Sequence, residues 1–421
     1  MNKKREVPLK LRIFTLYILL SFGTGSILAG GFQINEHGSK AMGLGGAFTA
    51  VVSDASAVYW NAAGMSFLEG TNFILGAALI APGTSFRGVT PAVDKTRMTS
   101  QVFFPPHFFV THKISESFSV GLGASVPFGL GTLWQDDWIG NQLAVETELT
   151  TIAVPLVVSW KILDNLSISA GGSYHHASVL IRQAKSLAPF EGDAFVKLEG
   201  EESSAFGYNF GFLWKPLEVL SVGGSFKSEV AFSFEGTAET TGPDQLASAL
   251  PSGDISAELT TPLNIQGGIA LRVIKQLQIS ADFQYVGWSS YDTLAVDFKD
   301  EAFDDLAEPR LYEDTYAIRF GAQYDISDEF SLLGGVYYDK NPVDPNNLSP
   351  SLPDSDRLGF SIGAEAQITE HLGISGSYLF IRSSELTVTE SNQEYTPGGS
   401  KFNGTYNASA NLLSLSFHYS L

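Results

Sequence analysis

The sequence of 421 residues contains no cysteine and only four methionines. Disulfide bonds are therefore excluded, and the missing thiolates argue against a soft-metal site. Charged residues are also scarce: they make up 17% of the chain, compared with about 25% in soluble domains. This shortage fits a protein with a lipid-facing surface, and nothing in the sequence calls for a cofactor.

Long apolar runs are missing as well. The one apolar stretch near the start, residues 13–22, follows a basic segment and precedes small residues that end at Ala29. This order is typical of a secretory signal peptide, so we expect residues 1–29 to be removed on export. The alternative is an N-terminal membrane anchor, but a helix needs about 20 apolar residues to span a bilayer. The rest of the chain does not read as a helical membrane protein.

Basic residues are fewer than acidic residues, and the net charge is −20. Nucleic acid is an improbable partner for such a polyanion, because binding to phosphates depends on basic residues. Much of the acidity falls in presumed loops such as residues 297–314. Solvated loop charge explains it best, with divalent cations near an anionic outer surface as an alternative.

A repeated hairpin pattern is the strongest internal signal. In each copy a tight polar turn joins two segments in which apolar and polar residues alternate. The six copies are residues 112–120, 160–168, 214–222, 271–279, 324–332 and 367–374. Period-2 alternation predicts strands with one apolar and one polar face.

Long polar segments separate the hairpins. Counted along the chain, the predicted strands number fourteen. Six tight turns and seven long loops fit fourteen antiparallel strands with both ends on one side. The predicted fold is all-β, a transmembrane antiparallel β-barrel over residues 71–421, with an apolar outside and a polar lumen. The last strand alternates to Leu421, which resembles an outer-membrane assembly signal. A soluble β-sandwich is the alternative.

Residues 30–70 do not alternate and are rich in glycine. This length is enough for a small hatch inside the lumen. The stretch Gly43-Leu-Gly-Gly could suggest a phosphate loop, but no strand precedes it and no Lys-Ser/Thr follows.

Several motifs resemble the FadL family of long-chain fatty-acid outer-membrane transporters. Residues 31–36 (GFQINE) followed by 43–48 (GLGGAF) are similar to the family's mature start. Residues 54–65 are similar to its hatch motif Asn-Pro-Ala-Gly, although Ala62 replaces the proline. Further matches lie at 127–131, 227–230, 282–291, 338–342 and 352–357. The resemblance covers the mature chain and implies a fourteen-stranded barrel with an N-terminal hatch.

The resemblance also implies binding residues. Phe32 matches an N-terminal phenylalanine that touches the ligand, and Asn61 and Ala63 match the hatch motif. A capture groove is implied between two outer loops, for which the apolar candidates are Leu187, Phe190, Leu246 and Leu250. Ordinary loop packing is an equally good explanation for any one of these four.

Two further sets of candidates follow from the strand pattern. Alternation places Lys227 and Arg319 in the lumen as partners for a carboxylate, although Glu229 and Asp282 could simply neutralise them. The family's lateral exit corresponds to residues 127–145, where Gly129, Gly131 and Gly140 could interrupt strand pairing. Glu146 and Glu148 also break the apolar outer face there.

The function expected is diffusive uptake of hydrophobic small molecules, most of all long-chain fatty acids, across a Gram-negative outer membrane. The alternatives are an aromatic- or alkane-hydrocarbon channel, a structural or adhesive barrel without a ligand, and a barrel lipase. We find no catalytic constellation and expect no enzyme activity. The partners expected are the ligand, outer-membrane lipid and lipopolysaccharide, and the assembly machinery. A monomer is the simplest state for a closed barrel.

Overall fold

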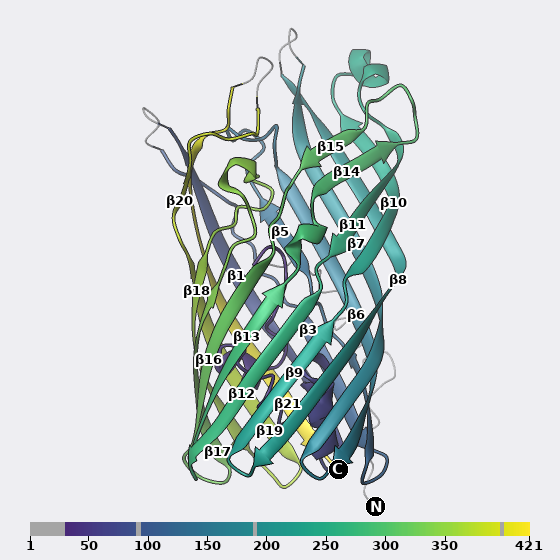
Figure 1. The fold of residues 1–421 in the computed structure, drawn as a ribbon. Coiled ribbons are helices and arrows are strands. Elements are labelled where there is room, and N and C mark those ends of the chain that lie inside the picture. Colours follow the sequence, from purple (N-terminus) through teal and green to yellow (C-terminus); the bar gives the residue numbers. More distant parts are fainter. Residues whose placement is uncertain (1–29, 90–93, 188–191, 396–399) are drawn as a thin grey trace, which may run out of the picture.

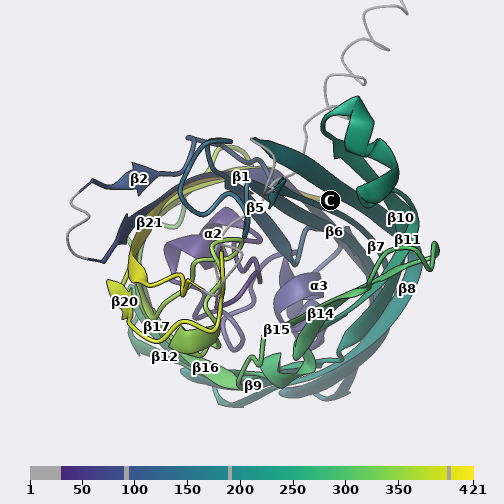
Figure 2. The ribbon, with the colours of Figure 1, turned by 90° about the horizontal axis from the view of Figure 1, so that it is seen from above.

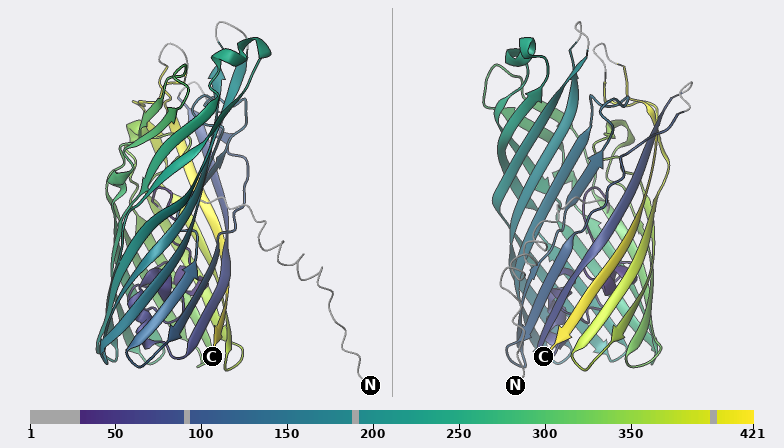
Figure 3. Two further views of the ribbon diagram at one scale, coloured as in Figure 1. Left: turned by 90° about the vertical axis from the view of Figure 1, so that its right-hand side faces the viewer. Right: turned by 180° about the vertical axis from the view of Figure 1, so that it is seen from behind.

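A computed structural model describes residues 30–89, 94–187, 192–395 and 400–421. The described chain forms a closed antiparallel β-barrel of 14 strands (Figure 1). The first strand, β1 (Thr71–Gly88), pairs with the last, β21 (Gly404–Ser420), from Asn72–Ser420 to Gly88–Gly404 and so closes the ring (Figure 3, right). The predicted barrel and its strand count are confirmed.

Several barrel strands are interrupted and appear as two segments. The remaining β segments are β2 (Thr96–Arg97), β3 (Pro106–Lys113), β4 (Phe118–Ala124), β5 (Gly129–Leu133), β6 (Glu146–Leu163), β7 (Leu166–Ser186), β8 (Asp193–Leu217), β9 (Leu220–Lys227), β10 (Val230–Thr241), β11 (Gly253–Thr261), β12 (Asn264–Ile274), β13 (Leu277–Val286), β14 (Thr293–Phe298), β15 (Leu306–Pro309), β16 (Thr315–Asp325), β17 (Phe330–Asp339), β18 (Arg357–Gln367), β19 (Leu372–Ser383) and β20 (Leu386–Val388).

Alternation of side chains along the strands explains the barrel. On β6, Ile152 and Leu156 face outward and are exposed, whereas Ala153 and Val157 face the interior and are buried. An apolar exterior suits lipid, and closure satisfies the backbone hydrogen bonds that lipid cannot. Tight turns lie at one end of the barrel and the long loops at the other (Figure 1).

The third strand is interrupted. Alternation of apolar and polar residues predicts it at residues 117–127, but it breaks after Ala124 and resumes as β5. A single bridge between Ser125 and Ala153 spans the break. The break forms a kink, and it is one of the features that shape the interior.

The N-terminal segment from residue 30 to residue 68 lies inside the ring of strands (Figure 2). It contains α2 (Ser39–Gly43), α3 (Ala57–Trp60) and the 3-10 turn η1 (Ala62–Phe67). The other short turns are η2 (Asp244–Ala249), η3 (Trp288–Ser290) and η4 (Pro345–Asn347). No helix of the described chain is long and apolar enough to cross a membrane.

Close packing holds α2 against one side of the barrel. Lys40 forms an ion pair with Glu365 of β18 at 2.7 Å. The Ser377 hydroxyl donates to the Ser39 carbonyl at 2.8 Å, and the Ser361 hydroxyl donates to the Gly43 carbonyl at 2.9 Å. These bonds satisfy backbone groups that would otherwise be buried without partners.

Candidate functional site

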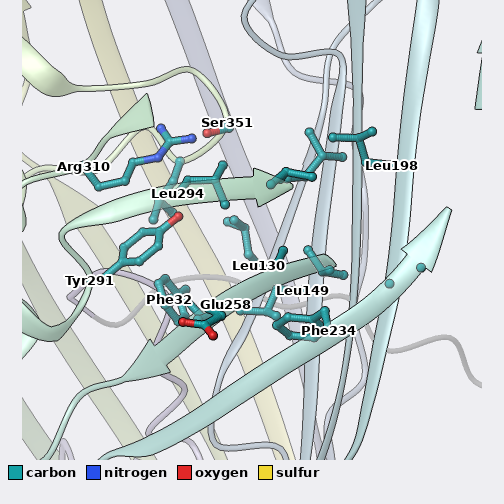
Figure 4. A pocket seen from close by; sticks show the side chains of 18 of the residues that line it. Phe32, Leu130, Leu149, Leu198, Phe234, Glu258, Tyr291, Leu294, Arg310 and Ser351 are labelled. Atoms are coloured by element: carbon teal, nitrogen blue, oxygen red, sulfur yellow. The ribbon is translucent and has the colours of Figure 1, made fainter. Parts of the chain in front are cut away.

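A cavity of about 800 Å³ lies between the N-terminal segment and the long loops (Figure 4). We call it the upper cavity. Inward-facing apolar side chains make up most of its wall: Leu130, Leu149, Val179, Ile181, Leu198, Phe234, Ile255, Leu259, Leu294, Val296 and Leu352. Such a wall suits an apolar ligand.

A polar group stands at one side of this apolar wall. Arg310 is 5% exposed and lies beside Tyr291 and Ser351 (Figure 4). Its Nη2 donates to Glu308 at 2.9 Å, whereas its Nε has no hydrogen-bond partner in the described residues. Burial raises the pKa of both Tyr291 and Tyr312, so both phenols stay protonated. This corner can therefore offer several donors to an anion.

Phe32 forms the floor of the upper cavity. Its ring lies 4.7 Å from that of Trp288, 5.5 Å from Tyr291 and 6.0 Å from Phe128. The backbone around it bonds the kinked third strand, because Gly129 N–H donates to the Phe32 carbonyl at 2.8 Å. The Ile34 N–H likewise donates to the Pro127 carbonyl at 2.8 Å. Gln33 of the N-terminal segment thus pairs with Phe128 in a single antiparallel bridge at the kink.

A second cavity of about 750 Å³ lies below Phe32, and we call it the lower cavity. It is bounded by the N-terminal segment and by the kink of the third strand. Its lining includes Gln33, Val58, Tyr59, Asn61, Ser125, Pro127, Phe128, His175, Asn209, Lys227, Ser228 and Val230. The lower cavity is more polar than the upper one and reaches the barrel wall.

Asn61 ties the N-terminal segment to the wall. Its Nδ2 donates to the carbonyls of Thr49 and Phe212, both at 2.9 Å, and its Oδ1 accepts from the Ala63 N–H at 3.2 Å. Ala63 is fully buried, and its carbonyl accepts from the Ser167 hydroxyl at 2.6 Å. The side chain of Asn61 therefore caps η1 and joins it to β8.

Comparison with known proteins fits this geometry. Residues 20–421 match the family model described as "Outer membrane protein transport protein (OMPP1/FadL/TodX)". The chain belongs to this family. Its members are transport proteins of the outer membrane rather than a class of enzymes, so the predicted outer-membrane location is confirmed.

Individual relatives are distant but cover nearly the whole chain. A 47 kDa outer membrane protein of Pasteurella multocida is 26% identical, over 95% of this chain and 96% of its own. A long-chain fatty acid transport protein of Salmonella typhi is 25% identical, over 88% and 91%. The crystal structure of a Pseudomonas aeruginosa FadL homologue has a TM-score of 0.84 at 22% identity, over 93% and 99%. The P. putida toluene transporter TodX has a TM-score of 0.73 at 16% identity, over 92% and 99%, and both structures show the fold alone.

The two cations predicted for the lumen lie in different surroundings. Lys227 lines the lower cavity, and its ammonium lies 3.3 Å from the ring centre of Tyr59. Arg319 is 2% exposed and donates to the Gln284 side chain at 2.8 Å, away from the residues that line either cavity. Asp282 does not bond either cation directly, because its carboxylate accepts from the backbone N–H groups of Phe48 and Thr49.

Three of the predicted loop residues come together. Leu187 and Leu250 are each 7% exposed and pack in one small cluster, with Leu246 partly buried against it. Phe190 lies outside the described residues. The loops therefore present an apolar cluster at the outer end, distinct from the upper cavity.

The three predicted glycines lie beside the kink rather than in it. Gly129 and Gly131 belong to β5 and pair with Thr150 and Glu148 of β6. Gly140 lies in the following loop against Trp138. The pairing breaks earlier, between Ala124 and Gly129. Glu148 lies on the same outward face of β6 as Ile152 and Leu156. It lies beyond these apolar residues, toward the outer end of the strand.

Arg310, Tyr291 and Tyr312 were not among the predicted site residues. Alternation predicts strands at residues 276–300 and 312–326, which contain Tyr291 and Tyr312, and a loop at residues 301–311, which contains Arg310. Tertiary packing, which the sequence does not reveal, buries all three. The sequence carries one signal, a lone arginine within the acidic stretch of residues 297–314.

Proposed function

We propose that this chain carries long-chain fatty acids into the cell by diffusion, within its family's role in outer-membrane transport of hydrophobic substrates. The upper cavity supports the proposal, because its apolar wall can bury an alkyl tail at a gain of about 0.8 kcal/mol per CH₂. Arg310 with its neighbouring phenols can replace the water that a carboxylate loses on entry. The juxtaposition of apolar wall and buried arginine is the observation that carries this function.

The route begins at the loop cluster of Leu187, Leu246 and Leu250 and continues into the upper cavity. Residues 30–70 act as the hatch, with Phe32 beneath the ligand and Asn61 as its tie to the wall. Release is lateral, at the kink of the third strand near Gly129 and Gly131. Residues 1–29 are the signal peptide, removed before the assembly machinery inserts a monomeric barrel among outer-membrane lipid and lipopolysaccharide.

Hydrocarbon uptake is the second candidate. Most of the side chains that line the upper cavity are apolar, the lining also includes Glu199 and Glu258, and Arg310 already has Glu308 as a partner. A ligand without a carboxylate would leave that pair undisturbed. A structural or adhesive barrel would need neither the cavity nor the buried donors.

The test is uptake of labelled oleate by cells that lack their own fatty-acid transporter. The wild type is compared with Asn61→Arg at equal outer-membrane levels, because the buried place of the Asn61 amide is too small for a guanidinium. Oleate uptake that the wild type restores and the variant loses supports fatty-acid transport through a working hatch. A correctly inserted wild type without uptake of oleate, but with uptake of labelled toluene, would replace the fatty acid by a hydrocarbon.

A further inference from the structure

We propose that the barrel wall contains a second lateral portal, between β8 and the strand formed by β9 and β10. Through it, apolar ligands pass between the lower cavity and the surrounding lipid. The proposal deepens the proposed function and rests on it, but it concerns a part of the wall remote in sequence from the kinked third strand.

The ladder between these two strands is interrupted. Toward the turns, β8 pairs with β9 as far as Asn209 opposite Lys227. One further backbone bond, from the Ser228 N–H to the Tyr208 carbonyl at 2.9 Å, continues this register. Toward the loops, β8 pairs with β10 from Glu201 opposite Glu235. The register is the same on both sides of the interruption, so the two strands run alongside each other without slipping. Between these positions, residues 202–207 and 229–234 show no ladder pairing with each other, and we call this unpaired stretch the slit.

Irregularities in both strands explain the slit. The register of β8 against β7 shifts by one residue, because Ala205 lies opposite His175 whereas Glu202 lies opposite Ala177. Such a bulge bends a strand and disrupts its ladder. On the other strand, Lys227 and Val230 both face inward although they are three residues apart, so the alternation changes between β9 and β10.

Side chains satisfy part of the backbone at the edges of the slit. The Tyr208 N–H donates to the Ser228 hydroxyl at 3.0 Å, and the Ser233 N–H donates to the Glu202 carboxylate at 3.1 Å. An unsatisfied backbone group in lipid costs several kcal/mol. Because side chains take over these bonds, the strands can stay apart without that cost at the two positions.

The lower cavity meets the lipid-facing surface at this place. Its lining includes the luminal side chains Asn209 and Lys227 together with outward-facing Tyr208, Phe210 and Phe226. Tyr208 and Phe210 are 54% and 53% exposed. A continuous wall would separate these two groups of side chains. The aromatic rings thus provide an apolar surface from the cavity to the outside.

Val230 and Gly207 approach each other across the slit. Val230 is 4% exposed, and a Cβ at Gly207 would lie 2.9 Å from its Cγ2. Glycine at this position keeps the slit from being filled by two side chains. A rotation of the valine side chain, or its removal, would widen the passage.

The position of the slit suggests which lipid it meets. Toward the turns, the outward side chains of β8 are apolar and exposed, as Phe210, Phe212 and Trp214 are. Toward the loops they become acidic, with Glu199 and Glu201 exposed. The slit lies at this border, which is the level of the outer leaflet in a barrel with an apolar band of about 25 Å.

A reversible cross-link can close the slit, since the chain has no cysteine of its own. The pair Gly207→Cys and Ser228→Cys is suitable, because a Cβ at 207 would lie 3.3 Å from the Ser228 hydroxyl. Ser221→Cys with Ala270→Cys is the control, as these residues lie opposite each other in the intact ladder of β9 and β12. Both variants are made in the full chain and checked for folded barrel and for the disulfide.

We expect oleate uptake to fall several-fold when the 207–228 disulfide forms and to recover on reduction, with the control unchanged. Full uptake by the verified cross-linked barrel would overturn the portal while leaving the proposed function intact. Absence of uptake in the wild type would refute both. If the cysteine pair does not fold, Val230→Ala serves instead: faster uptake supports the portal, and an unchanged rate in a folded barrel contradicts it.

Discussion

The two sides of the barrel differ in how completely their strands pair. From β17 through β19 the ladders are continuous, as between Phe330–Ala366 and Asp339–Arg357, and α2 packs closely against them. From β4 to β10 the wall is kinked at the third strand and open between β8 and β10, and both cavities lie against it. We call these sides the continuous wall and the interrupted wall. The comparison indicates that the continuous wall holds α2, whereas the interrupted wall holds η1 and also lines both cavities.

The largest effect on stability is expected when a side chain is added where the continuous wall contacts the N-terminal segment. Gly335→Val would place a side chain where the backbone of Leu44 and Gly45 lies. Because backbone cannot move aside easily, we expect a loss of at least about 3 kcal/mol in unfolding free energy. Thermal unfolding of the purified barrel in detergent measures it. Gly334→Val is the control, since nothing lies within 4 Å of a Cβ there. Equal stability of the two variants would contradict the close fit.

The next largest effect is expected from the ion pair that holds α2. Lys40→Met leaves Glu365 without its partner and should destabilise the protein by about 2 kcal/mol, less than for a fully buried pair because Glu365 keeps some contact with solvent. Adding Glu365→Gln should recover part of the loss. A double-mutant cycle in thermal unfolding tests the coupling. Additive losses would show that the pair does not hold the helix.

A smaller effect is expected on the interrupted wall, in ligand affinity rather than stability. Arg310→Leu removes charge-assisted hydrogen bonds worth about 1.5–3 kcal/mol, so oleate should bind roughly tenfold more weakly or worse. Binding of oleyl alcohol should change little. Arg97→Leu, an exposed arginine in β2, is the control. An equal loss for oleate and the alcohol would exclude a carboxylate role for Arg310.

The smallest effect is expected at the outer loops. Leu250→Ala removes part of the small apolar cluster with Leu187, which corresponds to about 1–2 kcal/mol of apolar burial. We expect a modestly slower association of a fluorescent fatty acid, together with a loss of thermal stability that corresponds to this burial. Val89→Ala, at an exposed position beyond β1, should have no effect. An unchanged rate for Leu250→Ala would remove the loops from the route.

The barrel could be predicted because its cause is local and repeated. Alternation over each strand, the six tight hairpins and the need for closure all point to the same count of fourteen. Asn61 was predicted from the resemblance of residues 54–65 to the family's hatch motif. Its capping bond to the Ala63 N–H is local in sequence. The partners of Asn61, the carbonyls of Thr49 and Phe212, depend on how the segment enters the barrel.

The interruption between β8 and β10 was not predicted. Residues 194–215 and 218–236 read as two continuous strands, and a bulge of one residue changes the alternation only slightly. Glycine and serine around Gly207 and Ser228 can lie on the inner or the outer face of a strand. The shift in the alternation of apolar and polar residues is therefore not visible in the sequence. Arg310 was missed for a different reason, since its burial depends on side chains from three separate segments.

Photoaffinity labelling with a diazirine fatty acid tests the central claim most directly. The purified barrel is labelled, digested and mapped by mass spectrometry. The account predicts label on peptides that carry Leu198, Phe234 and Leu259 of the upper cavity, with competition by excess oleate. Label that oleate displaces from the luminal face of β17–β19, or label confined to the lipid-facing surface without competition, would contradict it.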